Sequence, residues 1–283
     1  MAKRASETAI TTCYRHTDRE TAVSCSSCGR PICPDCMTPT PFGMRCPECS
    51  RQKTKVHTAA TLTATPQLTY VLIAINVAVF VATIATSGGF SGTSGEIYRN
   101  GALYGPAVAD GDWWRIVTAG FLHAGLLHLA FNMYFLYYLG MLLEPAIGKL
   151  RFGTIYFVSL VGGSFGALVA TPHGLTVGAS GAVFGLMGAG ILAMRARGID
   201  PMQSGLGVAL LLNLGITFIV PGIAIGGHLG GLAAGLLVGF LMFDVAERRG
   251  LSANVVCAVC AVLGVALLIG SVMLAESQAP PGF

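Results

Sequence analysis

Four short pairs of metal-binding side chains lie close together near the N-terminus. They are Cys13-x-x-His16, Cys25-x-x-Cys28, Cys33-x-x-Cys36 and Cys46-x-x-Cys49. Two such side chains separated by a tight turn can bind one tetrahedral Zn²⁺, so the four pairs supply enough ligands for two ions. Few apolar residues lie between the ligands, and metal binding would therefore provide much of the folding free energy. The spacing predicts two structural zinc ions.

A second group of polar residues lies inside long apolar stretches. Ser180 and His228 belong to two of these stretches, and His128 and Asn132 belong to a third, FLHAGLLHLAFN. Polar side chains within a membrane are costly, so a functional reason is expected. A serine beside a histidine provides a nucleophile and its base, while further polar groups can hold an oxyanion. These residues predict hydrolytic chemistry if folding brings them together.

The composition indicates which elements must position these residues. Of the 283 residues 53% are hydrophobic and only 11% charged, against about 25% charged in soluble domains, which excludes an ordinary soluble protein. From Leu68 onward, seven apolar stretches are each about 20 residues long, enough to cross a bilayer. They cover approximately 68–86, 116–143, 152–170, 180–196, 204–220, 224–243 and 255–274. We therefore expect an all-α polytopic membrane protein with a small zinc-stabilised N-terminal domain.

The basic residues predict the orientation of these spans. A cytoplasmic N-terminus leaves only Arg99 and Arg115, of the 17 Lys and Arg, on the external side, as expected from the retention of positive charge in the cytoplasm. The loops 87–115, 171–179 and 221–223 and the C-terminal tail would then be external. Because cytoplasmic thiols stay reduced, this orientation also favours metal binding by the cysteine pairs.

Helix geometry suggests how the polar residues meet. Ser180 opens its span, where unpaired N–H groups favour developing negative charge. His228 lies at similar depth on a span that runs in the same direction. The two spans carry small-residue faces that allow close backbone approach: Gly181 and Gly185 on one, and Gly227, Gly231 and Gly235 on the other. The stretch FLHAGLLHLAFN is expected to be helical, so His128 and Asn132 lie on one face and His123 is displaced from His128 by about 140°.

Together these residues resemble the rhomboid intramembrane serine proteases over about residues 68–250. The marks are Trp114-Arg115, His123, His128, Asn132, Glu144, Gly178-x-Ser180-Gly181, and His228 with Gly231 and Gly235. The resemblance implies a six-helix core plus a seventh helix, a catalytic Ser180/His228 dyad, and an oxyanion site at His128, Asn132 and the Ser180 N–H. The other marked residues would be structural, with Trp114 and Arg115 in a loop embedded in the outer leaflet.

The resemblance implies cleavage of single-span membrane proteins near the external membrane face, without a cofactor for catalysis. The membrane is expected to be a bacterial plasma membrane. The alternative is a non-catalytic rhomboid relative that binds or escorts membrane proteins. Such a relative would be expected to lack the serine or the histidine, and both are present. The expected domains are 1–50, the zinc-binding domain; 51–67, a flexible linker; 68–250, the rhomboid core; and 251–283, the seventh helix and external tail.

The N-terminal domain resembles a B-box or a related cross-braced zinc finger. In that arrangement the first and third pairs share one ion and the second and fourth the other; the sequence does not distinguish this pairing from a sequential one. Residues 1–67 carry a surplus of only four positive charges and no basic run with interleaved aromatic residues, which disfavours nucleic acid. We expect this domain to bind a cytoplasmic protein.

Overall fold

The computed structural model describes residues 11–40, 43–51, 65–87, 93 and 95–279. The chain divides into two compact units, residues 1–62 and 63–283. Most of the predicted linker, residues 52–64, lies outside the described residues, as do residues 280–283 of the predicted tail.

The N-terminal unit consists of short elements joined by turns that carry the cysteine pairs. Strands β1 (Thr11–Thr12) and β2 (Glu20–Thr21) pair antiparallel, as do β3 (Thr38–Thr40) and β4 (Gly43–Arg45). A 3₁₀ turn, η1 (Pro34–Cys36), and a short helix, α1 (Pro47–Arg51), complete the described part. Its buried apolar cluster contains Ile32 and six of the cysteines. A core this small agrees with a fold that depends on metal ligation.

The second unit is helical, and its described residues contain seven apolar helical segments. By length and composition five could cross a membrane: α3 (Gln67–Ser87), α7 (Leu126–Ile147), α8 (Lys149–Ala170), α13 (Ala253–Gln278) and the segment Ile225–Arg249. That last segment comprises α11 (Ile225–Phe240), a π-helical turn η3 (Leu241–Val245) and α12 (Ala246–Arg249). Two apolar helices are shorter, α9 (Ser180–Ala196) and α10 (Leu206–Ile219). All seven predicted apolar segments are thus helical in the described residues, and five of them are long enough to cross a membrane, as in a multi-pass membrane protein.

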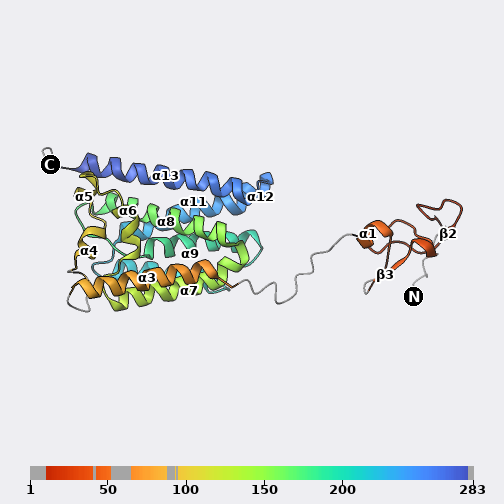
Figure 1. Ribbon diagram of the computed structural model, residues 1–283, viewed down its shortest axis with the longest axis horizontal. Coiled ribbons are helices and arrows are strands. Elements are labelled where there is room, and N and C mark those ends of the chain that lie inside the picture. The colour runs from red at the N-terminus through yellow and green to blue at the C-terminus, as the bar shows by residue number, and fades with distance from the viewer. Residues whose placement is uncertain (1–10, 41–42, 52–64, 88–92, 94, 280–283) are drawn as a thin grey trace, which may run out of the picture. The chain divides into compact units, whose positions relative to one another are not determined.

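The helices pack around α8, α9 and α11. Figure 1 shows α3, α7, α8, α9, α11 and α13 lying lengthwise beside one another. The short helices α4 (Glu96–Gly101), α5 (Gly105–Ala109) and α6 (Arg115–Thr118) gather at one end of this bundle (Figure 1). The seventh long segment, α13, packs mainly against α8. The core contains the fully buried side chains of Phe152, Tyr156 and Leu186.

The second predicted span differs from the structure in its first part. We expected one apolar segment over 116–143 with His123, His128 and Asn132 on a single helix. Instead α6 is followed by a 3₁₀ turn, η2 (Ala119–Phe121), and α7 begins only at Leu126, after Gly125 at φ +137°. A glycine adopts this positive φ readily, so Gly125 allows the chain to change direction before the helix. The predicted 140° separation of His123 from His128 is therefore wrong.

Close contacts between glycines bring α9 and α11 together. A Cβ at Gly231 would lie 2.1 Å from the carbonyl oxygen of Gly181, and one at Gly235 would lie 2.2 Å from that of Gly185. Any larger residue at either position would push the helices apart, because no Cβ fits at such a distance from backbone. The two small-residue faces expected from the sequence are therefore in direct backbone contact.

Glu144 joins the C-terminal part of α7 to the beginning of α3. Its carboxylate accepts hydrogen bonds from the backbone N–H of Leu68 at 2.9 Å and of Thr69 at 2.8 Å, and from the Thr69 hydroxyl at 2.7 Å. The first N–H groups of a helix have no partner within the helix. Glu144, only 3% exposed, therefore caps α3 from another helix and places its negative charge at the positive end of the helix dipole.

Candidate active site and metal centres

Ser180 is the first residue of α9. The preceding Gly178 has φ +122°, and its N–H donates to the carbonyl oxygen of Ala119 at 2.9 Å. A cavity of about 20 Å³ adjoins Ser180 and is lined also by Gly178, Gly181, Ser164 and Gly227 among others. A volume of this size holds roughly one water molecule. The serine hydroxyl thus lies at a helix N-terminus beside a small cavity that is partly polar.

His128 lies close to the same point. A Cβ at Gly178 would be 2.7 Å from His128 Nε2 and 3.6 Å from Ser180 Oγ, so Gly178 leaves the space in which these two side chains approach each other. The backbone N–H of Ala124 donates to His128 Nδ1 at 3.3 Å. Because Nδ1 accepts this bond, the proton of a neutral ring must be on Nε2. The His128 nitrogen beside Gly178 is therefore a hydrogen-bond donor.

The backbones next to Ser180 and His228 meet at Gly163 of α8. A Cβ at Gly163 would lie 3.0 Å from the carbonyl oxygen of Gly227 and 3.1 Å from the Cα of Gly181. Gly227 directly precedes His228, and Gly181 directly follows Ser180. The packing of three helices through glycines therefore brings together the first turns of α9 and α11, which carry the serine and the histidine.

Two side chains that the sequence analysis did not single out contact His228. Phe184 stacks on the imidazole, with ring centroids 4.3 Å apart and planes inclined by 24°. Thr217 of α10 approaches from the edge, with Oγ1 2.7 Å from His228 Nδ1. Phe184 follows Ser180 by four residues and lies on the same face of α9. That spacing could have suggested Phe184, whereas the contact with Thr217 depends on how α10 packs.

The other predicted residues take different positions. Asn132 is buried on α7, and its amide donates to the carbonyl oxygen of His128 at 2.9 Å. His123 is fully buried before α7, and its ring lies edge-on to that of His128, with centroids 5.1 Å apart. Within the described residues neither ring nitrogen of His123 has a hydrogen-bond partner. His123 and His128 are therefore in contact, contrary to the separation expected from a continuous helix.

Arg115 stabilises the loop that precedes the site. Its guanidinium donates to Asp112 at 2.9 Å and to the carbonyl oxygens of Arg99 at 2.6 Å and Ala102 at 3.0 Å. The residue is only 7% exposed, so its side chain is packed within the loop. Trp114 is more exposed and donates from Nε1 to the carbonyl oxygen of Asn100 at 3.3 Å.

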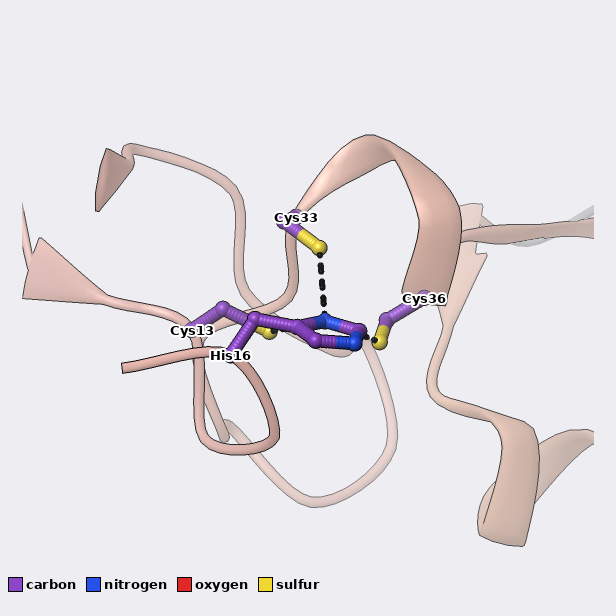
Figure 2. Close-up of side chains that lie close together, drawn as sticks. All are labelled: Cys13, His16, Cys33 and Cys36. Carbon is purple, nitrogen blue, oxygen red and sulfur yellow. Dashed lines mark hydrogen bonds between the residues drawn. The ribbon is translucent and has the colours of Figure 1, made fainter. Parts of the chain in front are cut away.

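The eight metal-binding residues of the N-terminal unit form two groups. One contains Cys13, His16, Cys33 and Cys36, and the other Cys25, Cys28, Cys46 and Cys49. Within each group the ligand atoms all lie within 4.8 Å of one another. In Figure 2 the side chains of the first group converge, with His16 Nδ1 3.3 Å from Cys33 Sγ and 3.4 Å from Cys36 Sγ. Each group could hold a metal ion, and the first pair is grouped with the third, as in a cross-braced finger.

Arg30 lies against the second group. Its guanidinium is 3.3 Å from Cys28 Sγ and 3.7 Å from Cys46 Sγ, and it lies over the ring of Tyr14 with 4.5 Å to the centroid. The hydrogen bond from Arg30 lowers the pKa of the Cys28 thiol because it stabilises the thiolate. Tyr14 in turn donates to Glu48, and this bond, together with nearby Arg15, lowers the pKa of the Glu48 carboxyl to about 2.

Comparison with known proteins identifies the family to which this fold belongs. Residues 110–245 match the Rhomboid domain, a range that contains Ser180, His128, His228 and the glycine contacts described above. Over 150 residues the chain is 38% identical to the putative rhomboid protease YdcA of Bacillus subtilis, covering 52% of this chain and 75% of YdcA. The chain belongs to the rhomboid family.

Two further relatives show how far the similarity extends. Rhomboid protease GluP of Bacillus subtilis is 34% identical over 187 residues, which is 65% of this chain and 36% of GluP. Rhomboid-like protease 1 of Toxoplasma gondii is 38% identical over 151 residues, which is 50% of this chain and 51% of that protein. The chain therefore spans only about a third to a half of these two relatives.

Proposed function

We propose that this protein is an intramembrane serine endopeptidase in which Ser180 is the nucleophile and His228 its general base. The observation that carries the proposal is the meeting of α9 and α11 at Gly163, which brings the backbones beside these two residues into contact. The stacking of His228 on Phe184, one turn after Ser180, supports it. Relatives named as rhomboid proteases support the same activity.

In the proposed reaction Ser180 Oγ attacks the carbonyl carbon of the scissile peptide bond and His228 Nε2 takes the hydroxyl proton. The carbon–nitrogen bond then breaks, and the leaving amine takes the proton from His228. Water, activated by His228, attacks the acyl-enzyme, releasing the acid and regenerating Ser180. Glu144 is engaged at the start of α3 and Asp112 with Arg115, which favours a dyad over a triad with a carboxylate.

The tetrahedral oxyanion would form beside His128. Its protonated Nε2 is well suited to donate to that oxygen, because its Nδ1 already accepts from Ala124. The Ser180 N–H lies at the helix N-terminus and would be a second donor. Asn132 would contribute through its amide, which has two N–H groups, only one of which is needed for its bond to His128.

The proposed substrates are single-span membrane proteins. A transmembrane helix hides its peptide bonds in its own hydrogen bonds, so cleavage requires a helix end weakened by small residues or proline. The distribution of Lys and Arg supports an external active site, a cytoplasmic N-terminus and an external C-terminus.

The two groups of cysteine and histidine would hold structural zinc. Thiolate and imidazole are the ligands that Zn²⁺ prefers in closed tetrahedral sites, and each group offers four such atoms. The ions would supply folding energy to a unit with a very small apolar core. The small surplus of positive charge in the N-terminal domain favours a cytoplasmic protein as its partner over nucleic acid.

The experiment is cleavage of a labelled single-span substrate by the purified full-length protein in lipid. Ser180→Ala and His228→Ala should each abolish cleavage while the circular dichroism spectrum stays unchanged. Ser271→Ala is the matched control, because the hydroxyl of this buried serine on α13 donates to the carbonyl oxygen of Leu267 four residues earlier, its one hydrogen bond within the described residues. Retained cleavage in Ser180→Ala would falsify the assignment. Folded wild-type protein that binds but never cleaves such substrates would favour the non-catalytic alternative.

A further inference from the structure

Helix α10 is attached to the rest of the protein mainly at its two ends. Of its 14 residues only Leu206, Gly207 and Thr217 are buried. The large side chains around Thr217 are exposed, including Phe218 and Ile219, which is 79% exposed. The only buried side chain near the C-terminal end of α10 is therefore a threonine, whose hydroxyl needs a partner in an apolar environment.

The Thr217 hydroxyl makes two close contacts. Its Oγ1 lies 2.7 Å from the carbonyl oxygen of Asn213, one turn earlier on α10, and 2.7 Å from His228 Nδ1. A hydroxyl has one proton to donate and two lone pairs with which to accept. The carbonyl oxygen can only accept, so the hydroxyl proton belongs to the bond with Asn213. In the hydrogen bond with His228, Nδ1–H must then be the donor, and the Thr217 oxygen is the acceptor.

This arrangement selects one tautomer of His228. A neutral imidazole with its proton on Nδ1 has a free lone pair on Nε2. That is the form a general base needs, and in serine hydrolases it is usually selected by a buried carboxylate on the far side of the ring. Here the neutral hydroxyl of Thr217 occupies the corresponding position. The ring is therefore held on its face by Phe184 and at its edge by Thr217.

We propose that Thr217 is a positioning residue that fixes the tautomer and orientation of His228. The inference rests on the proposed function, since it assigns His228 as the base. It also gives the end of α10 a functional contact: movement of this helix away from α11 would release Nδ1 and allow the ring to change tautomer. A neutral acceptor stabilises the protonated ring less than a carboxylate would, so the expected contribution to rate is modest.

The test compares Thr217→Val, which keeps the shape but removes the hydroxyl, with Thr217→Ser, which keeps the hydroxyl. Loss of one neutral hydrogen bond should lower kcat by roughly 3- to 10-fold with little change in KM, because the bond involves the base and not the substrate. Serine should restore most of the rate. Thr154→Val is the matched control, since Thr154 on α8 makes the same bond to the residue four earlier, Leu150, and has no histidine partner.

Nitrogen NMR of isotope-labelled histidine in the detergent-solubilised protein provides a readout independent of cleavage. The signals of His228, assigned with His228→Ala, should show a proton on Nδ1 in the wild type and a shift toward the Nε2 tautomer in Thr217→Val. A wild-type ring protonated on Nε2 would overturn the inference even if the valine variant did not fold. Unchanged kcat and unchanged signals in a folded Thr217→Val would also overturn it. Continued cleavage by Ser180→Ala would instead reject the proposed function. The NMR result would still show whether Thr217 accepts a hydrogen bond from His228.

Discussion

The imidazole of His228 stacks on the ring of Phe184, with centroids 4.3 Å apart and planes inclined by 24°. Ser180 and Phe184 lie one turn apart on α9, so the same helix that carries the proposed nucleophile also supports the face of the proposed base. The position of His228 therefore depends on both helices and on the glycines that join them.

Replacing Phe184 by leucine should weaken this support. Aromatic stacking contributes about 0.5–1.5 kcal/mol beyond area burial, which corresponds to a fall in kcat of roughly 2- to 12-fold. Steady-state cleavage of a labelled single-span substrate measures the effect. Phe157→Leu is the control, because Phe157 is exposed on α8 and its ring lies edge-on to that of Tyr156 and, within the described residues, stacks on no histidine. An equal fall in kcat in the two variants would mean that the effect comes from helix packing in general and not from the stacking on His228.

His128 and Asn132 should contribute unequally to oxyanion binding. His128→Ala removes a donor whose tautomer is fixed by Ala124, and kcat should fall by about 10²- to 10³-fold. Asn132→Ala should cost less, because the Asn132 amide also bonds to the carbonyl oxygen of His128. Single-turnover rates separate these effects from substrate binding. A larger loss for Asn132 than for His128 would reverse the assigned order.

Glu144→Gln should destabilise the helical unit. One carboxylate oxygen of Glu144 accepts from Leu68, and the other accepts two bonds from Thr69. Glutamine has a single acceptor oxygen, so at least one buried donor loses its partner, at a cost of about 1–3 kcal/mol. The melting temperature in detergent should fall accordingly. Glu276→Gln, at an exposed position near the end of α13, should leave it unchanged; a Glu144→Gln variant as stable as wild type contradicts the capping role.

The orientation of the chain can be tested at the two ends of α13. This helix has 26 residues and is about 39 Å long, enough to cross a bilayer. A cysteine at exposed Ser277 should react with a membrane-impermeant thiol reagent in intact cells, and one at exposed Ser252 should react only after permeabilisation. Labelling of the wild-type protein, which has only the native cysteines, gives the background signal. The reverse pattern would put the proposed active site on the cytoplasmic face.

The second metal centre should depend on Arg30. Four thiolates bound to Zn²⁺ leave a net negative charge, which Arg30 offsets through its contacts with Cys28 and Cys46. Arg30→Gln should weaken zinc binding at this centre by about 10- to 100-fold, seen as faster release of one of two zinc ions to a chelator. Arg15→Gln is the control, because the guanidinium of Arg15 pairs with the Glu48 carboxylate. Metal analysis that finds no zinc in the wild type would contradict the proposed ions.

Local sequence patterns predicted the components of this protein. Seven apolar stretches predicted seven helices, because the bilayer thickness sets the length of a span. The pairs of Cys and His predicted metal ligands, because a tight turn brings two nearby side chains to one ion. Gly181 and Gly231 predicted close helix contact, and a Cβ at Gly231 would indeed meet the Gly181 backbone. Each of these predictions rests on residues near one another along the chain.

Only the tertiary structure decided the contacts between distant segments. Hydropathy could not show that the chain breaks at Gly125 and brings His123 against His128, because Phe121, Leu122 and Ala124 beside this turn continue the apolar stretch. Likewise, the spacing of the cysteines left open whether the first pair shares an ion with the second or the third. The hydroxyl of Thr217 reaches His228 only because α10 and α11 return side by side. Such contacts depend on the packing of whole helices, which no local pattern of residues specifies.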